Sequence, residues 1–426
     1  MKVAVAGLWH LGCVTAACLA NAEHEVFAYD PSQETINNLQ AGVAPISEPG
    51  LDKLLLSGNI TFTADLQSLA HAELVWVTYD TPVDDNDIAD VAMVLNEIKA
   101  IIAVLQNPAL ILMSSQIPVG TTGELQQFVA EHHADKKIRF AVSPENLRLG
   151  KAIEVFTKPD RVIVGLEDEA DKKIIQELLK PFTENIVWMS VASAEMTKHA
   201  LNAFLATSVV FINELSTLCE RVGANAREVE RGLKTEDRIG PKAYLRPGNA
   251  IAGGTLARDV NYLIQLGEKE QLETPLFSSL LESNHAHKQW SARRMQEVLL
   301  NLRDKTIATL GLSYKVGSDT LRRSTAVEMG EWLKQQGANV VAYDPLVTLL
   351  PEHLLNVITL KPSLEAAIAG ADAILVTTEW PEFTALTAEQ LLAHNSQPVV
   401  FDASGFLMKT LGQDPRIRYY SVGNAA

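Results

Sequence analysis

Short apolar runs alternate with amphipathic stretches along the first part of the chain. The apolar runs predict buried strands, and the amphipathic stretches between several of them predict helices. Strands separated by helices are typical of a doubly wound parallel sheet. The predicted strands are Val3–Ala6, Glu25–Tyr29, Leu74–Thr78, Ala109–Ser114, Ile138–Val142, Arg161–Gly165 and Ile186–Met189.

The pattern becomes helical in the middle of the chain and returns to strands near its end. Apolar residues at three- and four-residue spacing predict one long helix from about Ser193 to Val222, and more helix follows to about Leu302. Strands are predicted again at Ile307–Gly311, Asn339–Tyr343, Ala373–Thr377 and Pro398–Asp402. We therefore predict an α/β protein in which two Rossmann-like doubly wound domains, 1–192 and 303–426, flank a central helical domain, 193–302.

The composition is that of a globular protein of several domains, because 426 residues are too many for one core. A formal charge of −16 argues against a nucleic acid or an anionic membrane as partner. Three cysteines are too few and too unpatterned for a disulfide framework or a zinc site, which favours a reducing cytoplasm. The apolar N-terminus could be an export signal, but Trp9 and His10 interrupt it. No run reaches the roughly 18 apolar residues of a membrane span.

A partial dinucleotide loop follows the first predicted strand. Gly7 and Gly12 are the first and last glycines of a G-x-G-x-x-G pattern, and Asp30 ends the next strand, where a carboxylate can bind the adenosine ribose of NAD. Trp9 takes the middle glycine position, where the backbone normally approaches the pyrophosphate. Either the indole swings aside and NAD binds, or the fold is kept without NAD affinity. The cofactor candidates here are Gly7, Trp9, His10, Leu11, Gly12 and Asp30.

Further motifs occur in order along the whole chain. They are Glu48-Pro49-Gly50-Leu51, Thr81-Pro82, Ser115–Thr121, Ser143–Arg148, Pro159-Asp160-Arg161, Lys198–Phe204, Arg238–Lys242, Gly311–Lys315, Asp319–Arg322 and Thr378-Glu379-Trp380. Together they resemble the UDP-glucose/GDP-mannose dehydrogenase family nearly end to end. The resemblance implies a homodimeric enzyme that oxidises the C6 alcohol of a nucleotide sugar to a carboxylate with two NAD and no metal.

The resemblance also implies roles for single residues. Lys198, Asn202 and Asp259 match residues that handle the reacting oxygen and an ordered water. Lys198 and Asn202, four residues apart, would share a helical face. Lys198 would stabilise an alkoxide, Asp259 would remove the alcohol proton through water, and Glu145 is a further acid/base candidate. The alternative for Lys198 is a solvated side chain on an amphipathic helix. Further candidates are Thr81, Gln116 and Arg322 for the cofactor and Leu147, Arg148, Lys151, Arg238, Tyr244, Arg246, Gly253 and Lys315 for the substrate.

Some of these candidates carry a further expectation or an alternative. Arg238 resembles an arginine that reaches the nucleotide from the neighbouring subunit. Any one of the cationic candidates could instead form a structural salt bridge.

The resemblance fails at the nucleophile of the family. The family loop reads Gly-Gly-Ser-Cys-Phe-Pro-Lys-Asp, whereas residues 253–259 read Gly-Gly-Thr-Leu-Ala-Arg-Asp. The cysteine position falls on Thr255, or on Leu256 if the alignment slides by one. Gln116 also replaces a threonine near the catalytic water, and Ser404 replaces a substrate-side arginine. Three cysteines lie elsewhere and are expected to be small core residues, namely Cys13, Cys18 and Cys219.

The missing thiol separates the two oxidations. Oxidation of the alcohol to the aldehyde needs only a base and an oxyanion stabiliser. In the second oxidation, the hydride donor is normally a thiohemiacetal that the aldehyde forms with the cysteine. We therefore predict an NAD-dependent nucleotide-sugar dehydrogenase of the UDP-glucose 6-dehydrogenase type, with a UDP-sugar favoured over a GDP-sugar. It either stops at the aldehyde or oxidises the aldehyde hydrate without a covalent intermediate. The alternative is a non-catalytic relative that binds a nucleotide sugar or an active paralogue. The long apolar-faced helix also predicts a homodimer.

Overall fold

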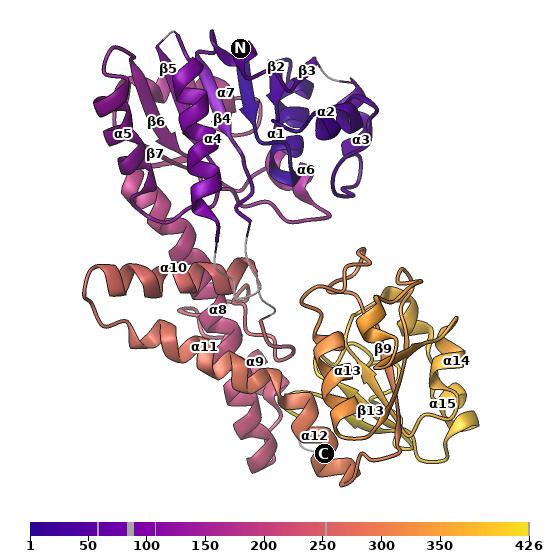
Figure 1. Cartoon of the computed structure of the whole chain (residues 1–426). Helices are drawn as coiled ribbons and strands as arrows, with labels where there is room; N and C mark the ends of the chain where they lie inside the picture. The colour runs from indigo at the N-terminus through magenta and orange to yellow at the C-terminus, as the bar shows by residue number, and fades with distance from the viewer. Residues whose placement is uncertain (58, 83–88, 107, 252–253, 425–426) are drawn as a thin grey trace. The chain divides into compact units, whose positions relative to one another are not determined.

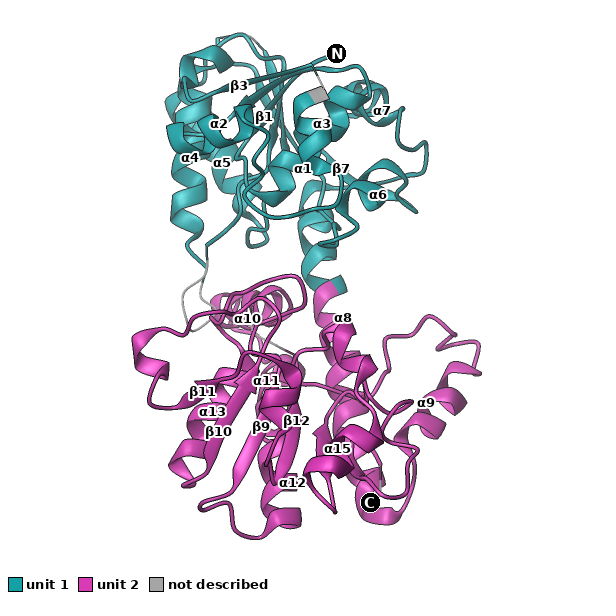
Figure 2. Cartoon of the chain, turned by 90° about the vertical axis from the view of Figure 1, so that its right-hand side faces the viewer, with its two compact units in different colours: residues 1–201 teal, residues 202–426 magenta. Residues whose placement is uncertain are grey.

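The computed structural model describes residues 1–57, 59–82, 89–106, 108–251 and 254–424. These residues form two compact units, Met1–Leu201 and Asn202–Ala426 (Figure 1, Figure 2). The long helix α8 (Val191–Val222) begins in the first unit and ends in the second. Each unit has its own sheet and its own buried apolar clusters. The predicted α/β class with a Rossmann-like fold at each end is confirmed.

Unit 1 is built on a sheet with the strand order β3-β2-β1-β4-β5-β6-β7-β8. The chain buries both faces of this sheet, because alternate residues of β1 pack into different cores: Val3 and Val5 into one, Ala4 and Ala6 into the other. The strands are β1 (Lys2–Ala6), β2 (Glu25–Tyr29), β3 (Ile60–Thr63), β4 (Leu74–Val77), β5 (Ala109–Met113), β6 (Ile138–Val142), β7 (Val162–Leu166) and β8 (Ile186–Met189). The helices are α1 (His10–Asn21), α2 (Gln33–Gln40), α3 (Leu51–Ser57), α4 (Val91–Val104), α5 (Thr121–His132), α6 (Ala152–Thr157) and α7 (Lys172–Leu179).

One strand of unit 1 runs against the predicted parallel order. β7 pairs antiparallel with β6, whereas the other strand pairs of this sheet among the described residues are parallel. The connection contains only α6, whose six residues span about 9 Å, against roughly 16 Å for the five residues of β6. So short a helix does not carry the chain back to the amino end of β6. β7 therefore begins near the carboxyl end of β6 and runs in the opposite direction.

Unit 2 combines helices with a second, parallel sheet in the order β11-β10-β9-β12-β13-β14. Its strands are β9 (Thr306–Leu310), β10 (Asn339–Tyr343), β11 (Ile358–Leu360), β12 (Ala373–Val376), β13 (Val399–Asp402) and β14 (Arg418–Tyr420). Its helices besides the end of α8 are α9 (Ala226–Lys234), α10 (Thr255–Lys269), α11 (Pro275–Lys288), α12 (Trp290–Leu299), α13 (Thr325–Gln335), α14 (Leu364–Ile368) and α15 (Ala388–His394). Short 3-10 turns lie at Leu66–Leu69, Glu169–Asp171, Glu352–Leu354 and Pro381–Ala385.

Three strands were not predicted, and all of them lie at a sheet edge: β3, β11 and β14. They have three or four residues each and mix threonine, arginine or tyrosine with apolar side chains. An edge strand has one paired neighbour, so its sequence needs no continuous apolar run. These strands were missed because their short, mixed sequences contain no continuous apolar run that would predict a strand.

Among the described residues, helix α8 has the length and the apolar composition that a membrane-crossing helix needs. Its most apolar window is 39% buried inside the structure. A core helix of a water-soluble protein passes the same test, so this finding is weak evidence for a membrane span. The prediction from the sequence concerned an uninterrupted apolar run, and Glu195, Lys198 and Glu214 interrupt α8, so this helix does not contradict it.

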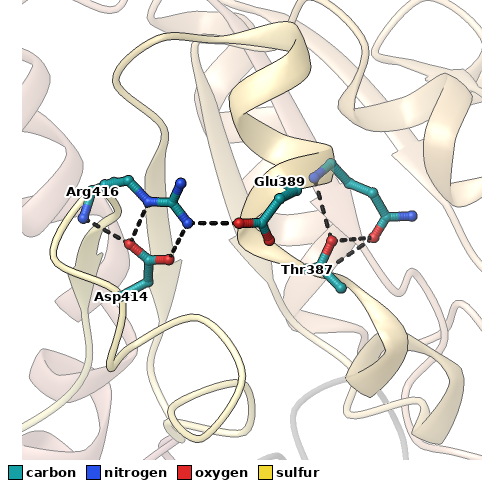
Figure 3. A network of polar contacts seen from close by, with 5 residues as sticks. Thr387, Glu389, Asp414 and Arg416 are labelled. Carbon is teal, nitrogen blue, oxygen red and sulfur yellow. Dashed lines mark hydrogen bonds and ion pairs between the residues drawn. The ribbon is translucent and has the colours of Figure 1, made fainter.

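A surface network joins the loop before β14 to α15 in unit 2 (Figure 3). Arg416 donates to Asp414, with Nη2–Oδ2 at 2.6 Å, and to Oε1 of Glu389 at 2.8 Å. The hydrogen bonds from Arg416 lower the pKa of Asp414 to about 2. Thr387 and Gln390 form a capping box that begins α15 beside it. Because these ion pairs are exposed to water, they hold the loop in place but add little stability.

Candidate active site

The dinucleotide loop turns where only glycine fits. Gly7 has φ +94°, and a Cβ there would lie 2.6 Å from the Tyr79 ring. A Cβ at Gly12 would lie 1.9 Å from the Gly7 carbonyl oxygen. Helix α1 begins at His10, and no side chain caps its N-terminus. The free N–H groups of such a terminus form a ready site for a pyrophosphate.

Trp9 lies just before this terminus and outside the core. The residue is 47% exposed and belongs to neither apolar cluster of unit 1. That its indole swings aside from the pyrophosphate stays a prediction. The glycine turn and the uncapped start of α1 fit NAD, with the pyrophosphate at that start.

Both sheets use the same turn, but only one leaves an aspartate accessible to a ribose. In unit 1, Asp30 accepts from Leu8 N at 2.9 Å and Ser32 N at 3.0 Å, and it is partly exposed. In unit 2 the matching aspartate is Asp344, which is 3% exposed. Its Oδ2 accepts from Leu312 N, Ser313 N, Ser313 Oγ and Trp380 Nε1, and its Oδ1 from Leu346 N and Val347 N. Asp30 therefore has lone pairs left for a ribose, whereas Asp344 closes its own turn.

Asp344→Asn is expected to destabilise unit 2 by about 3 kcal/mol, since either amide orientation places an NH2 group against two or more donors. Burial alone would raise the pKa of Asp344, but N–H donors from Ser313, Leu346 and Leu312 outweigh it and lower the pKa. The carboxylate therefore stabilises the fold above its unfolded pKa of about 3.9, and this contribution is lost as pH falls through the lower folded pKa. Urea unfolding from pH 7 to pH 3 measures both effects.

The exposed Glu331→Gln is the matched control for Asp344→Asn and should leave the unfolding midpoint unchanged. Equal midpoints for Asp344→Asn and the wild-type protein would contradict the expected role of this carboxylate.

An ion pair in unit 1 joins α8 to the loop after β6. Lys198 Nζ donates to Glu145 Oε1 at 3.0 Å and to the Glu145 carbonyl oxygen at 2.8 Å. The side chains are only 12% and 22% exposed. Glu145 Oε2 in turn accepts from Leu147 N at 2.8 Å. Lys198 is thus a held, nearly buried ammonium, and its alternative as a solvated surface side chain does not fit the structure.

A cavity of ≈ 200 Å³ lies beside this pair in unit 1. Aromatic side chains of Trp76, Phe156 and Phe182 line its interior. Glu145, Lys198, Leu147 and Arg148 line it as well, and so does Leu11 of α1. The candidates for the reacting end of the substrate therefore share a cavity with one residue of the dinucleotide loop.

The second pair of catalytic candidates lies in unit 2. Asn202, one turn after Lys198 on α8, donates through Nδ2 to Oδ2 of Asp259, which is fully buried on α10. Gly254 is the N-cap of α10 (Thr255–Lys269) and has φ +102°. Thr255, the first residue of α10, is exposed. Convergence of Lys198 with this pair on one oxygen stays a prediction.

A larger cavity of ≈ 690 Å³ in unit 2 is lined by several of the substrate candidates. Thr255 and Leu256, the two positions that could match the family cysteine, both line it. Tyr244, Arg246 and Tyr314 line it as well. Because Thr255 faces this cavity and is exposed, a side chain at this position can meet a bound ligand.

The remaining candidates are dispersed. Thr81 Oγ1 donates to the Gln116 carbonyl oxygen at 2.7 Å, which joins the loops after β4 and β5. Arg238 is exposed and pairs with Glu236 at 2.9 Å, and its expected reach to a neighbouring subunit stays a prediction. Lys151, Lys315 and Arg322 are exposed as well, and Gly253 lies outside the described residues.

None of the cysteines replaces the missing nucleophile. All three are free and buried. Burial, and next Asp30, raises the pKa of Cys13 to about 12, and burial raises the pKa of Cys18 to about 12. Thiols with such pKa values carry almost no thiolate at neutral pH. Among the described residues no group of three or more His, Cys, Asp or Glu side chains could hold a metal ion.

Three models of one protein family match the chain. The UDP-glucose/GDP-mannose dehydrogenase family is matched by its NAD binding domain at residues 1–183, its central domain at 192–286 and its UDP binding domain at 308–409.

Individual proteins match over the full length. The chain is 30% identical to UDP-glucose 6-dehydrogenase YwqF of Bacillus subtilis (strain 168), covering 100% of this chain and 98% of that protein. It is 32% identical to UDP-glucose 6-dehydrogenase of Rhizobium meliloti (strain 1021), with 99% of each covered. Its fold is similar to that of a UDP-glucose dehydrogenase from Pyrobaculum islandicum, with a TM-score of 0.87, 27% identity, and 100% and 98% of the two chains covered.

Proposed function

The chain belongs to the UDP-glucose/GDP-mannose dehydrogenase family, and on this premise we propose that it oxidises the C6 alcohol of a UDP-sugar. Membership makes it an NAD-dependent oxidoreductase that acts on a CH–OH group. One observation carries the proposal: the nearly buried ammonium of Lys198 is bound to Glu145 one helical turn before Asn202, which binds the buried Asp259. A non-catalytic relative would not need this arrangement, and that alternative is not favoured.

Each side chain has a distinct part in the proposed reaction. Lys198 stabilises the negative charge that develops on the C6 oxygen. Asp259, oriented by Asn202, takes the alcohol proton through a water, and Glu145 holds Lys198 in place and is a second acid/base group. NAD, when bound, supplies the hydride acceptor. Asp30 and the N-terminus of α1 hold its ribose and pyrophosphate, beside Thr81 and Gln116.

We also propose that the reaction stops at the aldehyde. Thr255 and Leu256 provide no thiol for a thiohemiacetal, and the cysteines of the chain are buried. An unactivated threonine hydroxyl stays protonated at neutral pH and is a poor nucleophile. The cofactor is assigned to residues 1–192 and the nucleotide sugar to 303–426, with the helical residues 193–302 between them and the cytoplasm as the compartment.

The test is to mix the purified protein with NAD and a panel of UDP- and GDP-sugars, and to count the NADH formed per sugar consumed. One NADH per UDP-sugar is the expected result, with the aldehyde trapped by a hydrazine and identified by mass. Two NADH per sugar would show that full oxidation proceeds without the thiol. No turnover on any sugar, with NAD and nucleotide sugar still bound, would overturn the proposal in favour of the non-catalytic alternative.

The proposed assembly is a homodimer through α8. Phe204, Phe211 and Leu218 recur every seven residues on this helix and are 72%, 50% and 61% exposed, and Val222 follows at 77%. Phe211→Glu is expected to give a monomer, because it places a charge in the middle of this apolar stripe. Light scattering after size-exclusion chromatography measures the mass. Leu349→Glu, at an 83% exposed leucine outside the stripe, should leave the dimer intact. A dimeric Phe211→Glu variant would exclude this interface.

A further inference from the structure

One buried carboxylate joins the dinucleotide loop, residues 7–12, to the loop at 147–152 that carries substrate candidates and is called the substrate loop here. The side chain of Glu48 is 1% exposed. Its Oε2 accepts from His10 Nε2 at 3.1 Å and from Gly150 N at 2.8 Å, and its Oε1 accepts from Ala152 N at 2.9 Å. His10 is the first residue of α1, at the terminus assigned to the pyrophosphate, and Gly150 follows the substrate candidate Arg148.

The substrate loop is therefore held by a carboxylate at each end. At its start, Glu145 accepts from Leu147 N and pairs with Lys198 of α8. At its end, Glu48 accepts from Gly150 N and Ala152 N. One end thus depends on the catalytic lysine and the other on the start of the dinucleotide helix.

The backbone around Glu48 is shaped for this contact. Gly50 and Gly150 both have φ +85°, a conformation that side chains other than glycine rarely adopt. A Cβ at Gly50 would lie 4.0 Å from Ile153 Cδ1, so the loop before α3 and the start of α6 lie side by side. A carboxylate buried in this way accepts its hydrogen bonds from protein groups. If one donor shifts, the carboxylate and its other donors must shift as well to keep these hydrogen bonds.

We propose that Glu48 is a positioning residue that couples NAD binding at α1 to the order of the substrate loop at 147–152. The inference rests on the proposed function, since it assumes NAD at the N-terminus of α1. When the pyrophosphate fixes the first turn of α1, His10 is fixed with it, and the Glu48 carboxylate holds the N–H groups of Gly150 and Ala152 more persistently. Because such coupling is reciprocal, a substrate that orders the loop also tightens NAD binding.

Amide hydrogen exchange on the full-length protein tests the proposal, with saturating NAD as the only ligand. In the wild-type protein, NAD is expected to slow exchange of the Gly150 and Ala152 amides about fivefold or more, the low end of typical coupling. His10→Leu removes the hydrogen bond that links Glu48 to α1, and an NAD titration checks that this variant, changed at a cofactor candidate, still binds NAD. It should keep the exchange rates of the NAD-free wild-type loop and lose the slowing by NAD. A purely structural role for Glu48 would leave that slowing unchanged in His10→Leu.

Two further variants complete the design. Glu48→Gln should speed exchange of the loop without NAD and also lose the slowing by NAD, and it decides the question if His10→Leu does not bind NAD. Glu25→Gln, which breaks an exposed ion pair with Lys2 in the same unit, should behave as the wild-type protein does. NAD that binds the wild-type protein without slowing these amides overturns this inference alone. A failure of NAD to bind at all overturns the proposed function with it.

Discussion

Lys198→Met is expected to lower kcat with a UDP-sugar by roughly a hundredfold to a thousandfold, the usual loss when one donor to a developing oxyanion is removed. Methionine keeps the apolar stem of the side chain and removes the ammonium. The wild-type Lys198 side chain is only 12% exposed, and two oxygens of Glu145 already hold its ammonium, so little reorganisation is needed during the reaction. A preorganised charge of this kind acts on the transition state more than on the bound substrate, so the loss falls on kcat more than on KM.

The measurement is initial-rate NADH formation, together with NAD affinity by titration. Lys173→Met, at an exposed lysine of α7, is the matched control and should keep wild-type kcat. Since Lys198 also holds Glu145, thermal unfolding of each variant shows whether the loop after β6 stays folded. A Lys198→Met protein with normal stability and unchanged kcat would remove Lys198 from the proposed reaction.

The parts of the site set by local sterics were predictable from the sequence. Gly7 and Gly12 follow from the close approach of β1 and α1, and Asp30 follows from its place after the next strand. The long helix was predictable too, because its apolar spacing persists over many turns. In each case the signal is carried by the residue type and its spacing along the chain, even where the partner is distant, as Tyr79 is from Gly7 and Leu8 is from Asp30.

The features that the sequence did not reveal depend on partners far along the chain. The direction of β7 depends on how far α6 carries the chain back. Glu48 was visible only as part of a motif, since its role needs His10 and the amides near Gly150, which are 38 and 102 residues away. The exposure of Trp9 was likewise open, because spacing alone does not say whether an indole is packed into the core or reaches solvent. A pattern can place such residues on elements but not against each other.

Thr255→Cys is expected to change the product from aldehyde to carboxylate, and the yield from one NADH per sugar to two. A thiol at this position would add to the C6 aldehyde to give a thiohemiacetal. Loss of its hydride to a second NAD gives a thioester, and water then releases the carboxylate and the free thiol. The structure supports the choice of site, because Thr255 begins α10, is exposed, and faces the unit 2 cavity together with Tyr314 and Arg246. The N-terminus of a helix also lowers a thiol pKa.

Mass spectrometry of the sugar product and the NADH count measure the change together. Thr255→Ser keeps a hydroxyl and should still yield one NADH, whereas Leu256→Cys tests the alternative alignment of the loop. A gain of the second oxidation in Leu256→Cys but not in Thr255→Cys would move the nucleophile position by one residue. If both cysteine variants stop at the aldehyde while the first oxidation is intact, the missing thiol does not explain the early stop. If the wild-type protein already yields two NADH, oxidation of the hydrate is the route, and Lys198 with Asp259 must then also activate the water that adds to the aldehyde.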